Sequence, residues 1–208
     1  MPRKKGSANA DFDAKKRELL RLLRSAIHGT PPPSSLRGLA KAANVTIPTL
    51  RHYFGDREEV FAAVFADCHA GGSREIEAAA TASGRFAESI RDLVRHVADG
   101  FRYGGLDRLH AVGLIEGLGD PRVAASYLAE VLEPTLRAAQ SRLETHTARG
   151  EMRPMDARMA SVRLISPILV LFLHQQGLGG AADYPIDMEA FLASHAEAFV
   201  VAHASVVI

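Results

Sequence analysis

The stretch Ser34–Phe61, SSLRGLAKAANVTIPTLRHYFGDREEVF, contains two short helical patterns separated by a tight turn. Either Ser34 or Ser35 can cap the first helix, whose apolar side carries four residues at helical spacing: Leu36, Leu39, Ala40 and Ala43. Asn is one of the few residues besides glycine that accept a left-handed backbone, so Asn44 can form the turn. Val45 is then expected to enter the core.

The second helix is predicted to begin at Ile47, because Thr46 can cap it and Pro48 falls in its first turn. At 100° per residue, Ile47, Leu50 and Phe54 lie within about 60° of one another and face inward. The outward face then carries Pro48, Thr49, Arg51 and His52.

This outward face has the side chains that a major groove requires. Arg51, together with Arg37 on the preceding helix, is the leading candidate to contact guanine, and His52 is a further donor. Thr46 and Tyr53 are expected to meet phosphates, whereas Pro48 and the Thr49 methyl group suit a thymine methyl. After Gly55, Asp56 and Glu59 form a capping-box pattern that predicts a further, long helix.

Residues 17–65 resemble the TetR (tetracycline-repressor) family. The family pattern has a small-residue helix, a G-V-S-like turn, T-L-Y-x-Y-F and K-E-x-L; this chain matches it with Ala43-Asn44-Val45-Thr46, Thr49-Leu50-Arg51-His52-Tyr53-Phe54 and Arg57-Glu58-Glu59-Val60. Asn44 replaces the turn glycine, and Arg51 replaces the aromatic residue that usually follows the leucine. The resemblance implies a homodimeric regulator that binds a palindromic operator and is released by a small-molecule effector.

The charge distribution is an independent argument for a nucleic-acid partner. Residues 1–57 carry 12 Lys and Arg against 4 Asp and Glu, whereas residues 58–208 carry 13 against 20, although the whole chain has a net charge of only +1. A basic N-terminal quarter favours phosphate binding through counterion release. An unevenly charged surface without a partner is the alternative.

The first residues, Met1-Pro2-Arg3-Lys4-Lys5-Gly6-Ser7, are too polar to fold alone, so residues 1–10 are predicted to be a basic disordered arm. The arm can follow a minor groove or act only as a solubilising tail, and the residues do not separate these interpretations. They lack the apolar segment of a secretory signal, which indicates a cytoplasmic protein.

Composition predicts an all-α fold of about nine helices. The chain is 47% hydrophobic, rich in alanine and leucine, and poor in alternating strand-like runs. A helix-turn-helix domain is predicted over residues 11–56, and a helical effector-binding and dimerisation domain over residues 57–208. The helices expected from caps and glycine breaks span 11–28, 35–43, 47–54, 57–80, 85–103, 106–117, 121–149, 156–176 and 187–205, and Gly71-Gly72 can end the fourth of them early.

The last two long helices are the most apolar part of the C-terminal domain. The run Ile165–Leu173 is too short to span a bilayer and contains Ser166 and Pro167, so no membrane partner is expected. A helix that is apolar nearly all round must be covered on every side, and a second copy of the chain can supply that cover. A homodimer through these two helices is therefore expected; a monomer with a buried central helix is the alternative.

Seven residues of the middle helices combine apolar bulk with polar tips, as in a small-molecule site, and suggest a largely apolar effector: Val97, Phe101, His110, Leu114, Tyr127, Val131 and Phe172. The same pattern is common in an ordinary core. Arg102, Arg108 and Glu116 can orient a charged group of the ligand, although exposure to solvent is the usual state of such residues.

Catalytic and metal-binding patterns are not found in the sequence. The nine histidines show no HExxH or clustered Cys/His spacing, and there is no nucleophile elbow, Walker loop or dinucleotide fingerprint. The single cysteine, Cys68, excludes an intramolecular disulfide and is expected to have a packing role. We therefore expect no cofactor, no metal and no enzymatic activity.

The sequence thus predicts a ligand-responsive transcriptional regulator, more specifically a repressor. Two alternatives stay open: a DNA-binding protein of the same fold that ignores ligands, and an all-helical metabolite-binding protein or enzyme without specific DNA affinity. The effector, the operator and the regulated genes are not encoded in any pattern identified above.

Overall fold

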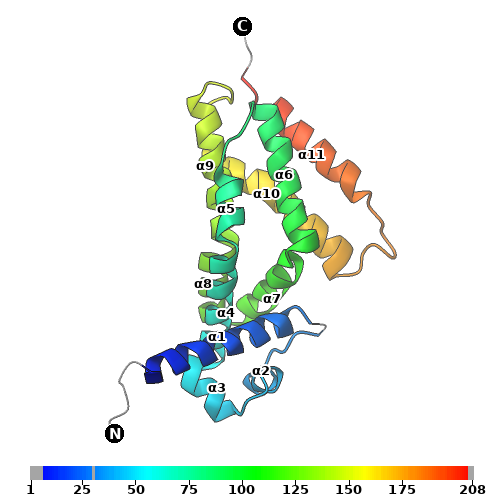
Figure 1. Cartoon of the computed structure of the whole chain (residues 1–208). Coiled ribbons are helices and arrows are strands. Elements are labelled where there is room, and N and C mark those ends of the chain that lie inside the picture. Colours follow the sequence, from blue (N-terminus) through cyan, green and yellow to red (C-terminus); the bar gives the residue numbers. More distant parts are fainter. Residues whose placement is uncertain (1–6, 30, 206–208) are drawn as a thin grey trace. The chain divides into compact units, whose positions relative to one another are not determined.

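The computed structural model describes residues 7–29 and 31–205 of the 208-residue chain. These residues form eleven α-helices and two short π-helical turns (Figure 1). Within the same residues, the only pairing of extended backbone is one antiparallel bridge between Met152 and Ala204. The predicted all-α fold class is confirmed.

The contacts divide the chain into two compact units that do not follow sequence order. The N-terminal unit contains the described residues up to Gly71 together with Val112–Glu130, and the C-terminal unit contains Gly72–Ala111 and the described residues from Val131 onward. The division expected from sequence, residues 11–56 against 57–208, is simpler than this interleaved arrangement. Each unit is described by itself below.

Three helices of the N-terminal unit form the helix-turn-helix region: α1 (Ser7–Ile27), α2 (Leu36–Ala42) and α3 (Ile47–Phe54). The Ser35 hydroxyl caps α2 by accepting the Gly38 N–H at 3.1 Å. Helix α1 begins four residues before its predicted start, so residues 7–10, which we assigned to the arm, are helical. Residues 1–6 of that arm lie outside the described residues.

The turns around α3 form as the sequence predicts. Asn44 adopts a left-handed backbone with φ of 53°, and the Thr46 hydroxyl caps α3. Gly55 follows α3 with φ of 92°, and a Cβ added there would lie 1.8 Å from a Glu59 carboxylate oxygen. That carboxylate accepts the Asp56 N–H at 2.7 Å while Asp56 accepts the Glu59 N–H at 3.0 Å. The predicted capping box is therefore confirmed, and Gly55 leaves room for it.

Helix α4 (Arg57–Gly71) packs against α1 and against α8 (Pro121–Tyr127) within the N-terminal unit. Its apolar face is buried, and the Phe65 ring lies 6.1 Å from the Tyr127 ring of α8. The Tyr127 ring also lies against Gly113 of α7 (Leu106–Gly119), where a Cβ would come within 2.1 Å of it. Arg24 of α1 also pairs with Asp67 of α4 at 3.3 Å. These contacts join α4, α7 and α8 to the helix-turn-helix region.

The C-terminal unit is built from α5 (Ser73–Ala80), α6 (Phe86–Tyr103), α9 (Glu133–Ala148), α10 (Ala157–Phe172) and α11 (Met188–His203). Helix α9 packs against both α5 and α10, and α6 packs against α11 and α10 (Figure 1). A single core cluster of buried apolar side chains runs through these helices and includes Phe101, Leu143, Leu164 and Phe172.

A buried arginine holds three of these helices together. Arg142 of α9 is 4% exposed and donates hydrogen bonds to the carbonyl oxygens of Ala78 and Ala79 at 2.6 and 2.7 Å, at the C-terminal end of α5. It also donates to the carbonyl oxygen and hydroxyl of Ser89 on α6, at 2.9 and 3.1 Å. The end of a helix carries partial negative charge and carbonyls that lack a full set of helical donors, so this guanidinium supplies donors to the carbonyl end of α5 and links it to α6.

Two of the predicted helices are interrupted. Helix α4 ends at Gly71, which is the early end that Gly71-Gly72 left open, so the segment 57–80 forms α4 and α5. The predicted helix 121–149 is interrupted by the π-helical turn Leu128–Leu132. That turn directly precedes Pro134, whose missing N–H removes one helical hydrogen bond and whose ring crowds the preceding turn. The irregularity next to Pro134 therefore takes the form of a π turn.

Helix α10 and the π-helical turn Leu173–Gly177 together form a 21-residue apolar segment. Within the described residues, it is the one helix with the length and composition to cross a membrane, which is weak evidence because the core helices of many proteins meet the same criterion. Only 39% of its most apolar 18-residue stretch is buried inside the chain.

Candidate nucleic-acid interface and ligand cavity

The outward face of α3 contains the residues that helical periodicity places there. Pro48, Arg51 and His52 are exposed, whereas Leu50 and Phe54 are buried. Tyr53 is partly buried at the edge of this face. Because the inward residues hold the helix in the core, the exposed guanidinium and imidazole are free to reach base edges or phosphates.

The hydroxyl groups of Thr46 and Thr49 act together at the start of α3. The Thr46 hydroxyl oxygen accepts the Thr49 N–H at 3.2 Å, and the two hydroxyl oxygens are 2.8 Å apart. Thr46 is exposed and Thr49 is partly buried. Both hydroxyls are thus engaged within the helix end, which orients the two side chains before any partner binds.

An aromatic cluster supports the other end of α3. Phe12 of α1 stacks on Tyr53 with ring centroids 4.7 Å apart, and its ring lies edge-on to His52 at 5.6 Å. His52 and Tyr53 also contact each other at 5.2 Å. We did not predict a role for Phe12; its only sequence signal is a large apolar residue between Asp11 and Asp13.

The turn between α2 and α3 forms a shallow depression on the same unit. Its lining includes Arg37, Lys41, Asn44 and Thr46. Arg37 and Lys41 are both exposed, and neither makes an ion pair within the described residues. Lys41, which sequence reasoning did not single out, adds a cation to the predicted set at a position suited to the phosphate backbone.

An ion network fixes the start of α4 in the N-terminal unit. Arg57 pairs with Glu116 of α7 and with Glu58, and it donates a hydrogen bond to the Ser34 carbonyl just before α2. Arg122 of α8 makes a two-pronged pair with Asp56 at 2.9 and 3.1 Å. This hydrogen-bonded guanidinium lowers the pKa of the Asp56 carboxyl. Glu116, which we considered as a ligand-orienting residue, is therefore engaged with Arg57.

A cavity of about 350 Å³ lies within the C-terminal unit, between α5, α6, α9 and the first residue of α7. Apolar groups make up most of its wall, including Ile76, Val97 and Leu106. Its polar groups come mainly from Glu75, His96, Asp99, Tyr103 and Thr135. A volume of this size, with few polar groups in an apolar wall, is typical of a small-molecule site.

The seven predicted ligand residues do not all meet at this cavity; only Val97 lines it. Phe101 is stacked between His110, at 5.2 Å, and Phe172, at 4.8 Å, in the core of the C-terminal unit. Val131 is buried in the same unit, whereas Leu114 and Tyr127 belong to the N-terminal unit. Burial lowers the pKa of His110 to about 4 and raises that of Tyr127 to about 12, so both side chains are neutral at physiological pH.

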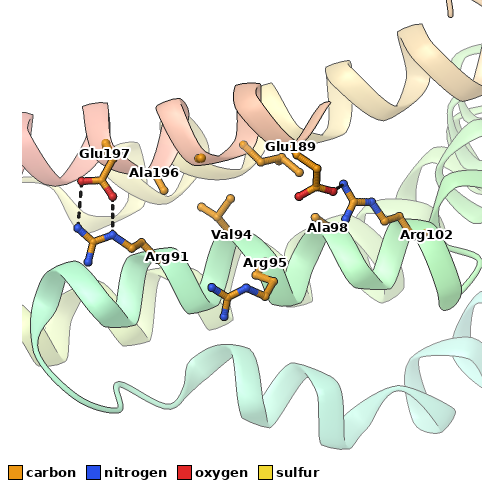
Figure 2. A pocket seen from close by; sticks show the side chains of 10 residues that line it. Arg91, Val94, Arg95, Ala98, Arg102, Glu189, Ala196 and Glu197 are labelled. Atoms are coloured by element: carbon orange, nitrogen blue, oxygen red, sulfur yellow. Dashed lines mark hydrogen bonds and ion pairs between the residues drawn. The ribbon is translucent and has the colours of Figure 1, made fainter. Parts of the chain in front are cut away.

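A second, smaller hollow of about 190 Å³ lies between α6 and α11. Figure 2 shows Arg91 and Arg102 reaching from α6 towards Glu197 and Glu189 of α11, one pair at each end of the hollow. Between these ion pairs, the floor is formed by Val94, Leu192 and small alanine side chains. The two ion pairs join α6 to α11. Because both glutamates are already paired, the hollow offers no free carboxylate to a ligand. Arg102, the second residue considered for ligand orientation, is part of this contact, and Arg108 lies 3.5 Å from Asp107.

No family model matches this sequence, and no curated protein sequence matches it. Solved structures do share the fold. A protein from Mesorhizobium loti, assigned to the TetR family of transcriptional regulators, aligns with a TM-score of 0.74 at 19% identity, over 93% of this chain and 98% of that one.

Two further structures align over most of their length. The transcriptional regulator FadR of Bacillus subtilis, solved in complex with stearoyl-CoA, has a TM-score of 0.67 at 17% identity and covers 88% of this chain and 97% of its own. SmeT, the repressor of a multidrug efflux pump of Stenotrophomonas maltophilia, has a TM-score of 0.63 at 16% identity, with coverages of 91% and 90%. The chain therefore has the fold of the TetR-family transcriptional regulators.

Proposed function

We propose that this protein is a ligand-responsive transcriptional regulator that binds a palindromic DNA operator as a homodimer. The observation that carries the proposal is the exposed face of α3, where Pro48, Arg51 and His52 are presented by a helix whose opposite side is buried. Arg37 and Lys41 extend this face with two further exposed cations. A short, firmly seated helix with basic residues beside it is the arrangement that reads a major groove and holds the adjacent phosphates.

The residues of this interface divide by their chemistry. Arg51 and Arg37 can donate two hydrogen bonds to guanine, whereas Thr46 and Tyr53 suit phosphate oxygens. Pro48 and the Thr49 methyl group suit the apolar thymine methyl, and His52 adds a donor beside Arg51. Lys41 is expected to contact a phosphate, since an ammonium group is a point charge without the planar fork that distinguishes a base.

Exposed apolar side chains on the last two helices support the homodimer. Met159, Val162 and Val170 of α10 and Val201 of α11 are all exposed. A second copy of the chain is the simplest cover for these side chains, because two-fold dimers are the commonest oligomers. Two recognition helices related by a dyad would read two half-sites about one helical turn of DNA apart, which gives the operator its palindrome.

The cavity of the C-terminal unit is the proposed effector site. It has the volume and the mainly apolar wall of a small-molecule pocket. A structural neighbour of the same fold was solved with stearoyl-CoA, which supports ligand binding by this type of domain and says nothing of the ligand of this chain. An effector would lower operator affinity if it bound better to the conformation in which the two recognition helices are out of register.

Repression is the proposed direction of control, and the cytoplasm the proposed compartment. A neighbour of this fold is described as a repressor. In the proposed mechanism DNA binding is the resting state and ligand binding ends it, so transcription rises when the effector appears. An operator-binding protein acts where the DNA is. Burial raises the pKa of the single Cys68 thiol to about 11, so this thiol is protonated at neutral pH and forms thiolate, the reactive species, only to a small extent.

Selection from a pool of random DNA duplexes tests the proposal. The full chain should enrich a palindromic sequence with half-sites about one helical turn apart, and sedimentation should give a dimer on one duplex. Arg51→Glu should abolish enrichment, whereas Arg137→Glu, which changes an exposed arginine of α9 in the same way, should not. Recovery of unrelated sequences, or equal loss with both variants, would remove the proposed function.

A further inference from the structure

The ionisable groups that line the cavity of the C-terminal unit are mainly acidic. Its lining contains two carboxylates, Glu75 and Asp99, and one imidazole, His96, but neither lysine nor arginine. The hollow between α6 and α11 has the opposite composition, with three arginines and two glutamates. The charges that line the two hollows therefore differ in sign, although α6 contributes to both.

Asp99 is the carboxylate that is available to a ligand. It is half-buried on α6 and makes no ion pair or hydrogen bond with the described residues. Its carboxylate oxygens are therefore not engaged by another described side chain, and the apolar wall beside them strengthens their attraction for a cation. A cation inside the cavity would supply that missing partner.

Glu75 makes a smaller contribution at the edge of the cavity. Its side chain is 75% exposed, and one carboxylate oxygen lies 3.7 Å from Nε2 of His96. The same His96 nitrogen donates to the Glu75 carbonyl oxygen at 2.9 Å, which attaches the imidazole to the backbone of α5. His96 is thus committed to α5, and Glu75 adds a solvent-screened negative charge near the entrance.

The remaining wall suits the rest of a cationic amphiphile. Ile76, Val97 and Leu106 provide an apolar surface for a short hydrocarbon or a ring. Tyr103, which lines the same cavity, is 83% exposed, and the face of its ring can stabilise a cation near the mouth. Gly100 keeps the wall open beside Leu106, because a Cβ at this position would come within 2.8 Å of a Leu106 methyl group.

We infer that this cavity selects a small apolar molecule that carries a positively charged nitrogen, with the nitrogen placed against Asp99 and the apolar part against Ile76, Val97 and Leu106. The inference rests on the proposed function only in naming the molecule an effector; the charge preference itself follows from the cavity. A carboxylate or phosphate ligand is disfavoured there, since like charges would meet without a compensating cation.

Calorimetric titration of the full chain with three probes of equal chain length tests the charge preference: octyltrimethylammonium, octanoate and 1-octanol. Octyltrimethylammonium should bind at least about 10-fold more tightly than octanoate, a difference of about 1.4 kcal/mol. Asp99→Asn should weaken binding of the cation about 10-fold and leave binding of 1-octanol unchanged. Asp99→Lys should reverse the preference, so that octanoate binds more tightly than the cation.

A matched control uses the same helix. Asp92→Asn changes an exposed aspartate of α6 that pairs with Arg95 and does not line the cavity, so the affinity for the cation should stay as in the natural chain. Circular dichroism should show the same helix content in all variants. Equal or tighter binding of octanoate by the natural chain, an unchanged cation affinity in Asp99→Asn, or no binding of the cation at all would overturn the inference.

The affinity for the selected operator separates this inference from the proposed function. If the cation binds through Asp99 and operator affinity does not change, the charge preference stands and the effector role of the cavity is lost. If octanoate reduces operator affinity and the cation does not, the chain is a ligand-responsive regulator but the charge preference is wrong.

Discussion

The α2–α3 region and the cavity of the C-terminal unit are assembled in opposite ways. Every group that shapes the start and turn of α3 comes from a run of consecutive residues, from the Ser35 cap to the Asp56–Glu59 capping box. The cavity takes its wall from α5, α6, α9 and α7, which are separated by up to 60 positions along the chain, from Glu75 to Thr135. Local signals therefore determine the first region, and long-range packing determines the second.

This difference has a consequence for stability. In the α2–α3 region, substitutions at caps and turns should each lower the free energy of unfolding by a modest amount. Around the cavity, substitution of one of the few buried groups that hold distant helices together should lower it by more. The four predictions below compare these two kinds of dependence, beginning with the largest effect.

Arg142→Met should have the largest effect on stability, about 2–4 kcal/mol in the free energy of unfolding. The substitution keeps a long apolar side chain but removes the guanidinium that donates to the buried carbonyls of Ala78, Ala79 and Ser89. Urea unfolding followed by circular dichroism measures the change. Arg137→Met, an exposed position on the same helix, should change stability by less than about 0.5 kcal/mol. Similar losses in the two variants would show that Arg142 does not hold α5 and α6 in place.

Arg51→Ala should reduce the free energy of operator binding by about 1–3 kcal/mol without changing stability. If Arg51 reads a base, the loss is confined to the operator sequence and the preference at one position becomes relaxed. Binding to a set of operators with single base changes, measured at constant salt, distinguishes this result. A uniform loss over all sequences would instead assign Arg51 to a phosphate, and Arg137→Ala serves as the control.

Lowering the pH should destabilise the C-terminal unit through His110. Burial lowers the pKa of His110 from 6.5 to about 4, so the unfolded chain binds a proton at a pH where the folded chain does not. Stability contributed by neutral His110 is complete above pH 6.5 and is lost as the pH falls towards 4. The loss between pH 7.5 and pH 5.5 should be about 1.4 kcal/mol.

His110→Leu provides the comparison for that pH dependence. The variant keeps an apolar side chain in the stack with Phe101 and removes the titrating group. Urea unfolding at the two pH values should then show a smaller decrease than in the natural chain, by the amount assigned to His110. An identical decrease in both proteins would mean that other groups cause the acid sensitivity.

Thr46→Ala should have the smallest effect, about 1 kcal/mol in the free energy of unfolding, because it removes the hydroxyl that caps α3. Thr46→Ser keeps the hydroxyl and should retain most of the stability. Thermal unfolding of the three proteins at one pH gives the comparison. If serine and alanine are equally destabilising, the Thr46 methyl group, and not the cap, supports the helix.

The sequence predicted the local backbone structure of the α2–α3 region. The left-handed backbone at Asn44, the start of α3 at Ile47 and the capping box at Asp56 and Glu59 are confirmed. Each depends on residues no more than four positions apart, for which propensity and capping chemistry are strong. Phe12 was missed because its contact with Tyr53 joins residues 41 positions apart.

The sequence predicted helix ends less well, and it did not predict which side chains distant in the chain make contact. The predicted helix 57–80 is interrupted at Gly72, and the predicted helix 121–149 contains a π turn before Pro134. Gly71-Gly72 and Pro134 mark where these segments can change, but the apolar periodicity continues past both positions, so the sequence alone did not fix the helix ends. Glu116 was considered as a ligand-orienting residue, but it pairs with Arg57, which lies 59 positions earlier in the chain.

By itself, the sequence determined that the chain is helical and that a capped, outward-facing helix follows a tight turn after Asn44. These properties depend on φ preferences, caps and periodicity over a few residues, which are present before the chain folds. Only the tertiary structure decided that Arg142 joins α5, α6 and α9, that Arg57 joins the start of α4 to α7, and that Asp99 lines a cavity without a partner. Such contacts are made between segments far apart in the chain, and no local pattern specifies which distant residue will be the partner.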